Sequence, residues 1–143
     1  MRVNFGRMLI SLAAIITAVV PFLADWNDSH LFSKQWSPHA RFHGVVSLGM
    51  TSLLSSVALW LLWRRSPDQD AAVTVAAMIP IAYWGPFFPA TLVRGTAIED
   101  PGHRLVRIAG VPTNLLGAGA TVITAGLGWF IDRRWRAGIA RTD

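Results

Sequence analysis

The chain has 143 residues, of which 52% are hydrophobic and only 15% are charged, and its mean hydropathy is +0.41. A water-soluble domain of this size usually carries about 25% charged residues, so the composition argues against an ordinary soluble enzyme and indicates a membrane protein. The chain contains no cysteine, which excludes disulfides, thiolate nucleophiles and sulfur ligands for metals.

Four apolar segments are each close to the roughly 20 residues that a helix needs to cross the hydrocarbon core of a membrane. We predict membrane-spanning helices at approximately residues 8–24, 40–63, 71–92 and 111–131. These segments contain no Asp, Glu or Lys, and Arg occurs only near their ends. The predicted fold is therefore all-α, a polytopic four-helix bundle that forms a single integral membrane domain over residues 1–143.

The basic residues are divided unequally between the two ends of this bundle. Eight arginines lie before the first span, between the second and third spans, or after the fourth span. The two connections at the opposite end, between the first and second spans and between the third and fourth, hold five basic residues. The positive-inside rule therefore predicts that both termini are cytoplasmic. The pI of 11.3 is explained by this topology signal, which also attracts membrane lipid of negative charge, and we expect no nucleic-acid partner.

Two of the spans have unusual sequences. The third contains IPIAYWGPFFP, and its prolines predict a helix that runs to about Tyr83 and then breaks. Two interpretations of the break are open. Either the broken backbone lies at membrane depth and is covered by protein or by a cavity, or the helix ends early and the following residues form a loop at the membrane surface. The fourth span repeats small residues every fourth position, among them Gly117, Thr121 and Ala125. This spacing predicts close helix packing inside the protein, with a homodimer through the fourth helix as the alternative.

The stretch DWNDSHLFSKQWSPHARFH, residues 25–43, concentrates polar and aromatic groups between the first two spans. Ser37 is a good N-cap and Pro38 suits the first helical position, so the second helix is expected to begin here. His39 and His43 are then four residues apart and share one face of that helix. The same region also allows a simpler interpretation, in which the histidines and acids only hold the loops together.

Two kinds of chemistry suit these residue types. Imidazole exchanges protons near neutral pH, so beside carboxylates it serves an isomerisation or a cyclisation, in which aromatic faces stabilise a developing cation. The candidate catalytic residues are His39, His43, Asp25, Asp28 and Glu99. The candidate residues for binding a small hydrophobic molecule, a lipid or an isoprenoid, are Trp26, Asn27, Trp36, Tyr83, Trp84 and Asn114.

Metal binding is the alternative for the same end of the bundle. The HxxxH spacing presents two imidazoles to one ion, and imidazole with carboxylate suits zinc, iron or copper. The candidate metal ligands are His39, His43, His30 and His103. A third interpretation is a partner subunit of a membrane complex, with a purely structural set of loops.

The segments GRMLISL, PFLADWN, DWNDSHLF and PHARFH resemble a family of small uncharacterised four-helix membrane proteins, most clearly over residues 6–45. This resemblance implies the same architecture and assigns no activity. At the level of fold, the chain also resembles the EXPERA group of sterol isomerases and lipid-binding receptors. That resemblance implies a pocket open to the membrane and lined by acids, a histidine and aromatic residues. The chain departs from the pattern because its predicted spans contain no buried carboxylate.

Overall fold

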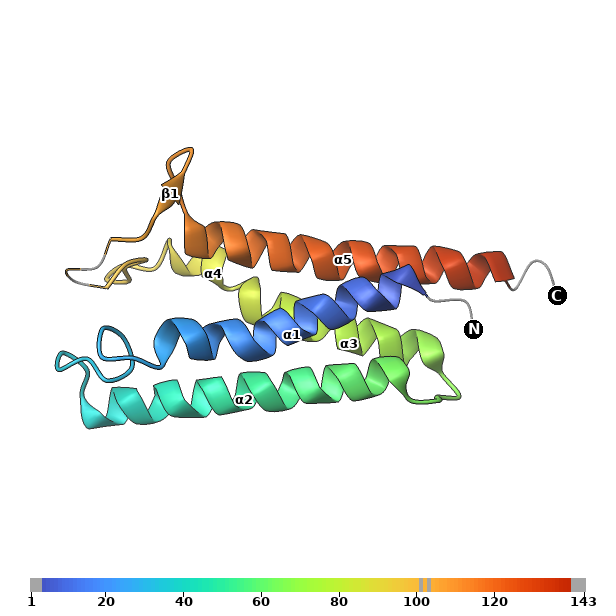
Figure 1. Ribbon diagram of the computed structural model, residues 1–143, viewed down its shortest axis with the longest axis horizontal. Helices are drawn as coiled ribbons and strands as arrows, with labels where there is room; N and C mark the ends of the chain where they lie inside the picture. Colours follow the sequence, from blue (N-terminus) through green and yellow to red (C-terminus); the bar gives the residue numbers. More distant parts are fainter. Residues whose placement is uncertain (1–3, 101, 103, 140–143) are drawn as a thin grey trace.

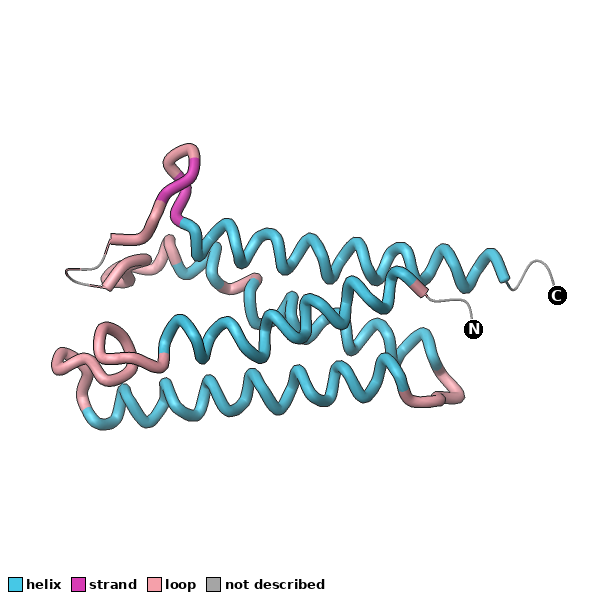
Figure 2. Tube along the Cα trace, viewed as in Figure 1, coloured by secondary structure: helices cyan, strands magenta, loops and turns pink. Residues whose placement is uncertain are grey.

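The computed structural model of the protein describes residues 4–100, 102 and 104–139. Its elements in chain order are α1 (Phe5–Asp25), α2 (Pro38–Trp63), α3 (Gln69–Trp84), α4 (Phe87–Ala90), β1 (Arg107–Ile108), β2 (Val111–Pro112) and α5 (Thr113–Ile139). The long helices lie side by side in an elongated bundle (Figure 1). The loop of residues 26–37 and the described part of residues 91–112, which contains β1 and β2, form one end, which we call the cap end (Figure 2). The described chain begins and finishes at the opposite end, the terminal end.

Four helical segments of the described chain are long and apolar enough to cross a membrane, namely Phe5–Asp25, Pro38–Trp63, Gln69–Ala90 and Thr113–Gly138. The predicted all-α bundle of four apolar helices is confirmed, and the chain is a multi-pass integral membrane protein. Large apolar side chains point outward, as expected for side chains that face lipid; Leu23 is 78% exposed and Leu53 is 71% exposed. The cytoplasmic placement of the termini stays a prediction from the arginine distribution.

Local capping determines where two of the helices begin. The hydroxyl of Ser37 accepts the backbone N–H of Ala40 at 3.1 Å, and Pro38 occupies the first turn of α2. The carboxylate of Asp68 accepts the N–H of Ala71 at 2.9 Å in the same way at the start of α3. Since each cap satisfies an amide that has no partner within its helix, the short sequence before each apolar segment fixes the helix start.

Helices α1 and α5 cross closely near the terminal end. A Cβ atom on Gly128 would lie 2.8 Å from the carbonyl oxygen of Gly6 and 2.8 Å from Cγ1 of Ile10, so only a glycine fits without movement of α1. Thr121 and Ala125, on the same face of α5, are also buried. Small residues of the fourth span therefore pack inside the protein, as predicted. From this crossing, α1 and α5 diverge toward the cap end (Figure 1).

The third apolar segment is interrupted close to the predicted position. Helix α3 ends at Trp84, and after Gly85 and Pro86 the single turn α4 follows. The Gly85 N–H still donates to the carbonyl of Ile81 at 2.8 Å, so the backbone remains helical up to the break. Pro86 has no N–H to donate, which prevents the ladder of hydrogen bonds from continuing unchanged. Between α4 and α5, β1 and β2 form a short antiparallel hairpin, which the sequence pattern did not predict.

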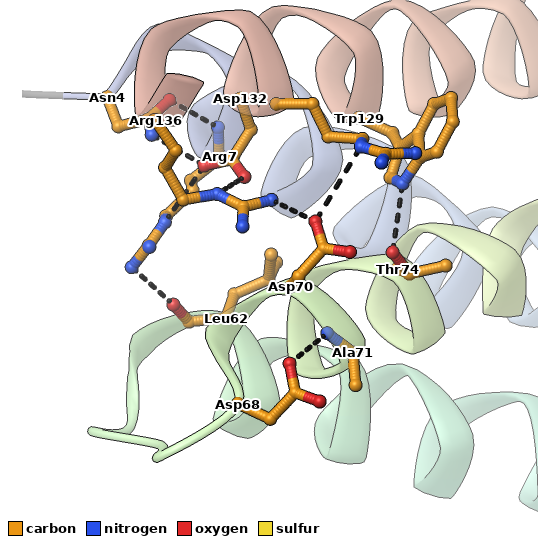
Figure 3. A network of polar contacts seen from close by, with 11 residues as sticks. Asn4, Arg7, Leu62, Asp68, Asp70, Ala71, Thr74, Trp129, Asp132 and Arg136 are labelled. Carbon is orange, nitrogen blue, oxygen red and sulfur yellow. Dashed lines mark hydrogen bonds and ion pairs between the residues drawn. The ribbon is translucent and has the colours of Figure 1, made fainter. Parts of the chain in front are cut away.

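A carboxylate is buried in α5, contrary to the expectation that the spans contain none. Helix α5 continues to Ile139, past the predicted end of the span, and so includes Asp132, which is 0% exposed. The Asp132 carboxylate accepts hydrogen bonds from Asn4 at 2.5 Å, from Arg7 at 3.2 Å and from Arg136 at 2.6 Å (Figure 3). The expectation was wrong because a buried charge is tolerated where neighbouring helices supply opposite charges and hydrogen bonds.

The Asp132 network joins all four long helices at the terminal end. A second nitrogen of Arg7, in α1, donates to the carbonyl oxygen of Leu62, in α2, at 3.1 Å. A second nitrogen of Arg136, in α5, donates to Asp70, in α3, at 2.9 Å (Figure 3). The two guanidinium groups thus connect one buried carboxylate to both remaining helices, and this end of the bundle is held by charge as well as by packing.

Candidate functional site

A cavity of about 1090 Å³ lies in the half of the bundle nearer the cap end, between α1, α3, α4 and α5. The divergence of α1 from α5 and the interruption of the third apolar segment leave this space. Ile16 and Val20 of α1, Phe87 of α4 and Leu115 of α5 are among its apolar lining residues. The cavity is therefore an apolar space that reaches from the middle of the bundle to the loops.

Polar side chains gather where the cavity meets the loops. Nδ1 of His30 lies 2.9 Å from a carboxylate oxygen of Asp100, and Nε2 of the same ring lies 3.9 Å from an oxygen of Asp25. A carboxylate only accepts hydrogen bonds, so the imidazole donates from Nδ1 to Asp100. The three side chains are about one-third exposed, at 32%, 29% and 35% respectively. His30 is thus held between two carboxylates at the mouth of the cavity.

Carboxylates outnumber guanidinium groups on the cavity lining. Asp25, Glu99 and Asp100 belong to the lining, together with Arg104. Glu99 also forms an ion pair of 2.6 Å with Arg107 of β1, whose side chain is half exposed. Asp25 and Asp100 both lie beside the imidazole of His30. The mouth of the cavity is consequently rich in hydrogen-bond acceptors.

An aromatic group forms the wall of the cavity at the end of α3. The rings of Tyr83 and Trp84 meet edge to face with centroids 5.0 Å apart, and Phe87 packs against Trp84 at 4.9 Å. The indole N–H of Trp84 donates to the hydroxyl of Thr17 at 2.9 Å, and that hydroxyl donates to the carbonyl of Ala13 at 2.7 Å. Because Trp84 is only 6% exposed and bonded to α1, this wall is fixed in position.

The structure brings part of the predicted site together. Five of the predicted catalytic and ligand-binding residues line the cavity, namely Asp25, Tyr83, Trp84, Glu99 and Asn114. His30, predicted only as a metal ligand, lines it as well. Six others are absent from the lining that the structure describes, namely His39, His43, Asp28, Trp26, Asn27 and Trp36. His103 lies outside the described residues.

Two of the six residues position His30 instead. The side-chain oxygen of Asn27 accepts the backbone N–H of Ser29 at 3.0 Å and that of His30 at 3.1 Å, which shapes the turn after α1. Trp36 packs against the imidazole with ring centroids 5.0 Å apart. Asp100, the hydrogen-bond partner of His30, was not among the predicted site residues. Its only sequence signal is an acid in the second loop, because the two residues are 70 positions apart.

His39 and His43 lie on an exposed face of α2, away from the cavity lining. Their Nε2 atoms are 3.1 Å apart, as expected for imidazoles on one helix face. Arg41, between them in sequence, donates to the carbonyl oxygens of Leu31 at 3.1 Å and Ser33 at 3.3 Å, so its charge is directed into the loop. In residues 4–100, 102 and 104–139, no group of three or more histidine and acidic side chains is arranged to hold a metal ion.

A protein-family comparison matches residues 9–142 to DUF6640, a family of unknown function. No curated protein and no solved structure matches the chain. An uncharacterised family agrees with the expectation from the sequence. The assignment of the segments DWNDSHLF and PHARFH as a mark of the family, and the resemblance to the EXPERA group, stay predictions.

Proposed function

Because the chain belongs to DUF6640, a family of unknown function, we propose a function from the geometry alone: the protein binds a small hydrophobic molecule, a lipid or an isoprenoid, in its cavity. The observation that carries this proposal is a space of about 1090 Å³ with apolar walls and polar groups gathered at one end. Ligand sites in proteins are typically about 300–1,000 Å³ and combine apolar lining with a few convergent polar groups. The apolar body of the ligand would contact the walls, and its polar head would reach the cap end.

The charges at the cavity mouth indicate the kind of polar head. The carboxylates of Asp25 and Asp100 are hydrogen-bond acceptors that line the cavity. The Nδ1–H of the neighbouring His30 ring already donates to Asp100. A hydroxyl or an amine donates a hydrogen bond to a carboxylate, whereas a fatty acid or a phosphate is repelled by it. We therefore favour a neutral or cationic amphiphile over an anionic lipid as the ligand.

The arrangement of His30 favours proton transfer as a second candidate function. An imidazole between two carboxylates is suited to accept a proton from a substrate carbon and to return it at another position. The faces of Tyr83 and Trp84 would stabilise positive charge that develops on the substrate. The proposed reaction class is an isomerisation or cyclisation of the bound hydrophobic molecule, with Asp25, His30 and Asp100 as the proton-carrying groups.

Lipid that co-purifies with the protein tests the binding proposal. Ala120 lines the cavity, so Ala120→Phe is expected to fill part of it and to remove the retained lipid. Ala82→Phe is the matched control, because Ala82 is exposed in α3 and is not a lining residue. Mass spectrometry of organic extracts should find one lipid class enriched in the wild type and in Ala82→Phe, and depleted in Ala120→Phe.

Added ligands test the chemistry of the head. In detergent, farnesol is expected to raise the melting temperature of the wild type and of Ala82→Phe, and oleate is expected to have a smaller effect. Equal effects of farnesol on Ala120→Phe and on the wild type would contradict binding in the cavity. A larger effect of oleate would contradict the preference for donor headgroups. An isomerase would convert the retained lipid, and His30→Ala would still bind the lipid but no longer convert it. A protein that only binds the lipid would convert it in neither form.

A further inference from the structure

His39 and His43 form a pair that the proposed cavity function does not use. Both rings are exposed at the start of α2, and their Nε2 atoms are 3.1 Å apart. The rings meet nearly at a right angle, with centroids 4.6 Å apart, and Phe42 flanks the pair. We propose that these two imidazoles form an exchangeable binding site for a divalent transition-metal ion, with copper preferred over zinc.

The separation of the two nitrogens suits a shared metal ion. Zinc and similar ions bind imidazole nitrogen at about 2.0–2.1 Å, which places two ligand nitrogens about 3.3 Å apart in a tetrahedral site. Two neighbouring ligands at a right angle, as in tetragonal copper(II) geometry, are about 2.9 Å apart. The observed distance between Nε2 of His39 and Nε2 of His43, 3.1 Å, lies between these values. A metal ion would therefore replace the hydrogen bond between the rings with only small rotations of the side chains.

The surroundings of the pair determine which ions it would take. The guanidinium of Arg41 is bound to the carbonyl oxygens of Leu31 and Ser33, so this nearest cation in the sequence is directed away from the imidazoles. Two neutral nitrogen ligands without a carboxylate favour copper and zinc over magnesium and calcium, which prefer oxygen. The positive end of the α2 dipole lowers the affinity for any cation, which is one reason to expect a weak and exchangeable site.

The pair leaves coordination positions open. A structural zinc site is closed by four protein ligands, whereas a site with fewer protein ligands keeps positions for water or for an external group. Within the described chain, no third histidine or acidic side chain joins the pair as a metal-binding group. The inferred site is thus an open, solvent-facing site at the cap end that gains and loses its ion readily.

Copper titration of the full-length protein, metal-free and without a histidine tag, tests the inference. In dodecyl maltoside, the wild type is expected to bind one Cu²⁺ with a dissociation constant in the micromolar range, to bind Zn²⁺ more weakly, and to show no binding of Mg²⁺. Either His39→Ala or His43→Ala is expected to weaken Cu²⁺ binding by about tenfold or more, because the loss of a mere hydrogen-bond partner of a metal ligand already costs about 10–100-fold in affinity. His30→Ala is the control and should bind Cu²⁺ like the wild type, because His30 is engaged with Asp100.

Electron paramagnetic resonance of the copper-loaded wild type gives a readout that does not depend on any variant. Superhyperfine splitting from two imidazole nitrogens would support the site. The absence of this splitting would overturn the proposed site. Equal Cu²⁺ affinity of the wild type and the double variant His39→Ala, His43→Ala would also overturn it. In that case the two rings only contact each other on the exposed face of α2.

Discussion

The close crossing of α1 and α5 predicts that Gly128→Ala destabilises the protein strongly, whereas Gly126→Ala on the same helix does not. A methyl group on Gly128 would lie 2.8 Å from the carbonyl oxygen of Gly6 and 3.0 Å from the backbone nitrogen of Ile10. Backbone atoms do not rotate out of the way, so the two helices must separate. A methyl group on Gly126 meets no atom of the described chain within 4 Å.

The size of the effect follows from these distances. Ordinary contact with a Cβ begins at 3.4 Å, so α1 and α5 must move apart by roughly 0.6 Å at the crossing. Such a movement would also stretch the 3.2 Å hydrogen bond from Arg7 to Asp132, one turn further along α5, beyond hydrogen-bond length. Overpacking of this kind costs about 1–3 kcal/mol, and the weakened network places Gly128→Ala near the upper value. Gly126→Ala instead gains up to about 1 kcal/mol from the higher helix propensity of alanine.

Equilibrium unfolding in mixed micelles, with increasing mole fraction of dodecyl sulfate, measures both free energies. We expect the two variants to differ by about 3–4 kcal/mol in their free energy of unfolding, with the wild type between them. The circular dichroism of each folded variant should be the same, since no helix is lost. A difference of less than about 0.5 kcal/mol would refute the close packing of α1 against α5.

Three further predictions concern other parts of the bundle. Asp132→Asn should lower the free energy of unfolding by about 3 kcal/mol in the same assay, because two guanidinium groups lose a fully buried carboxylate. Ser55→Ala should leave stability unchanged or raise it by up to about 1 kcal/mol, because the buried Ser55 hydroxyl has no hydrogen-bond partner in the described structure. Single cysteines at Gln35 and Ser66, introduced into a chain without native cysteine, should be labelled by an impermeant maleimide from the outside and from the cytoplasmic side, respectively.

Each of these predictions has an outcome that would contradict it. An unchanged free energy of unfolding in Asp132→Asn would mean that the ion pairs of Asp132 with Arg7 and Arg136 make no net contribution to stability. A loss of more than about 1 kcal/mol in Ser55→Ala would show that the hydroxyl has a partner. Labelling of the loop cysteine at Ser66 in intact cells, with protection at Gln35, would reverse the predicted orientation of the termini.

The sequence alone determined the features that depend on near neighbours in the chain. The lengths of the apolar segments predicted the four spanning helices, because a span must match the thickness of the hydrocarbon core. Ser37 and Pro38 predicted the start of α2, and the cluster of prolines and Gly85 predicted the interruption after α3. Spacing also placed His39 and His43 on one face. Each of these rests on geometry within a few residues.

Only the tertiary structure decided which distant side chains meet. The apolar run of the fourth span predicted an end before Asp132, yet α5 continues past it, and Asn4 and Arg7 reach its carboxylate from 128 and 125 positions away. His30 likewise binds Asp100 across 70 positions, while the pair on α2 is absent from the cavity lining. The rotation and depth of each helix in the bundle are set by contacts between helices, above all the crossing of α1 and α5. The small-residue spacing of the fourth span predicted that this helix packs closely, but neither that spacing nor the length of the apolar segments says which helix it packs against. For that reason the sequence predicted several lining residues but did not place the cavity between α1, α3, α4 and α5.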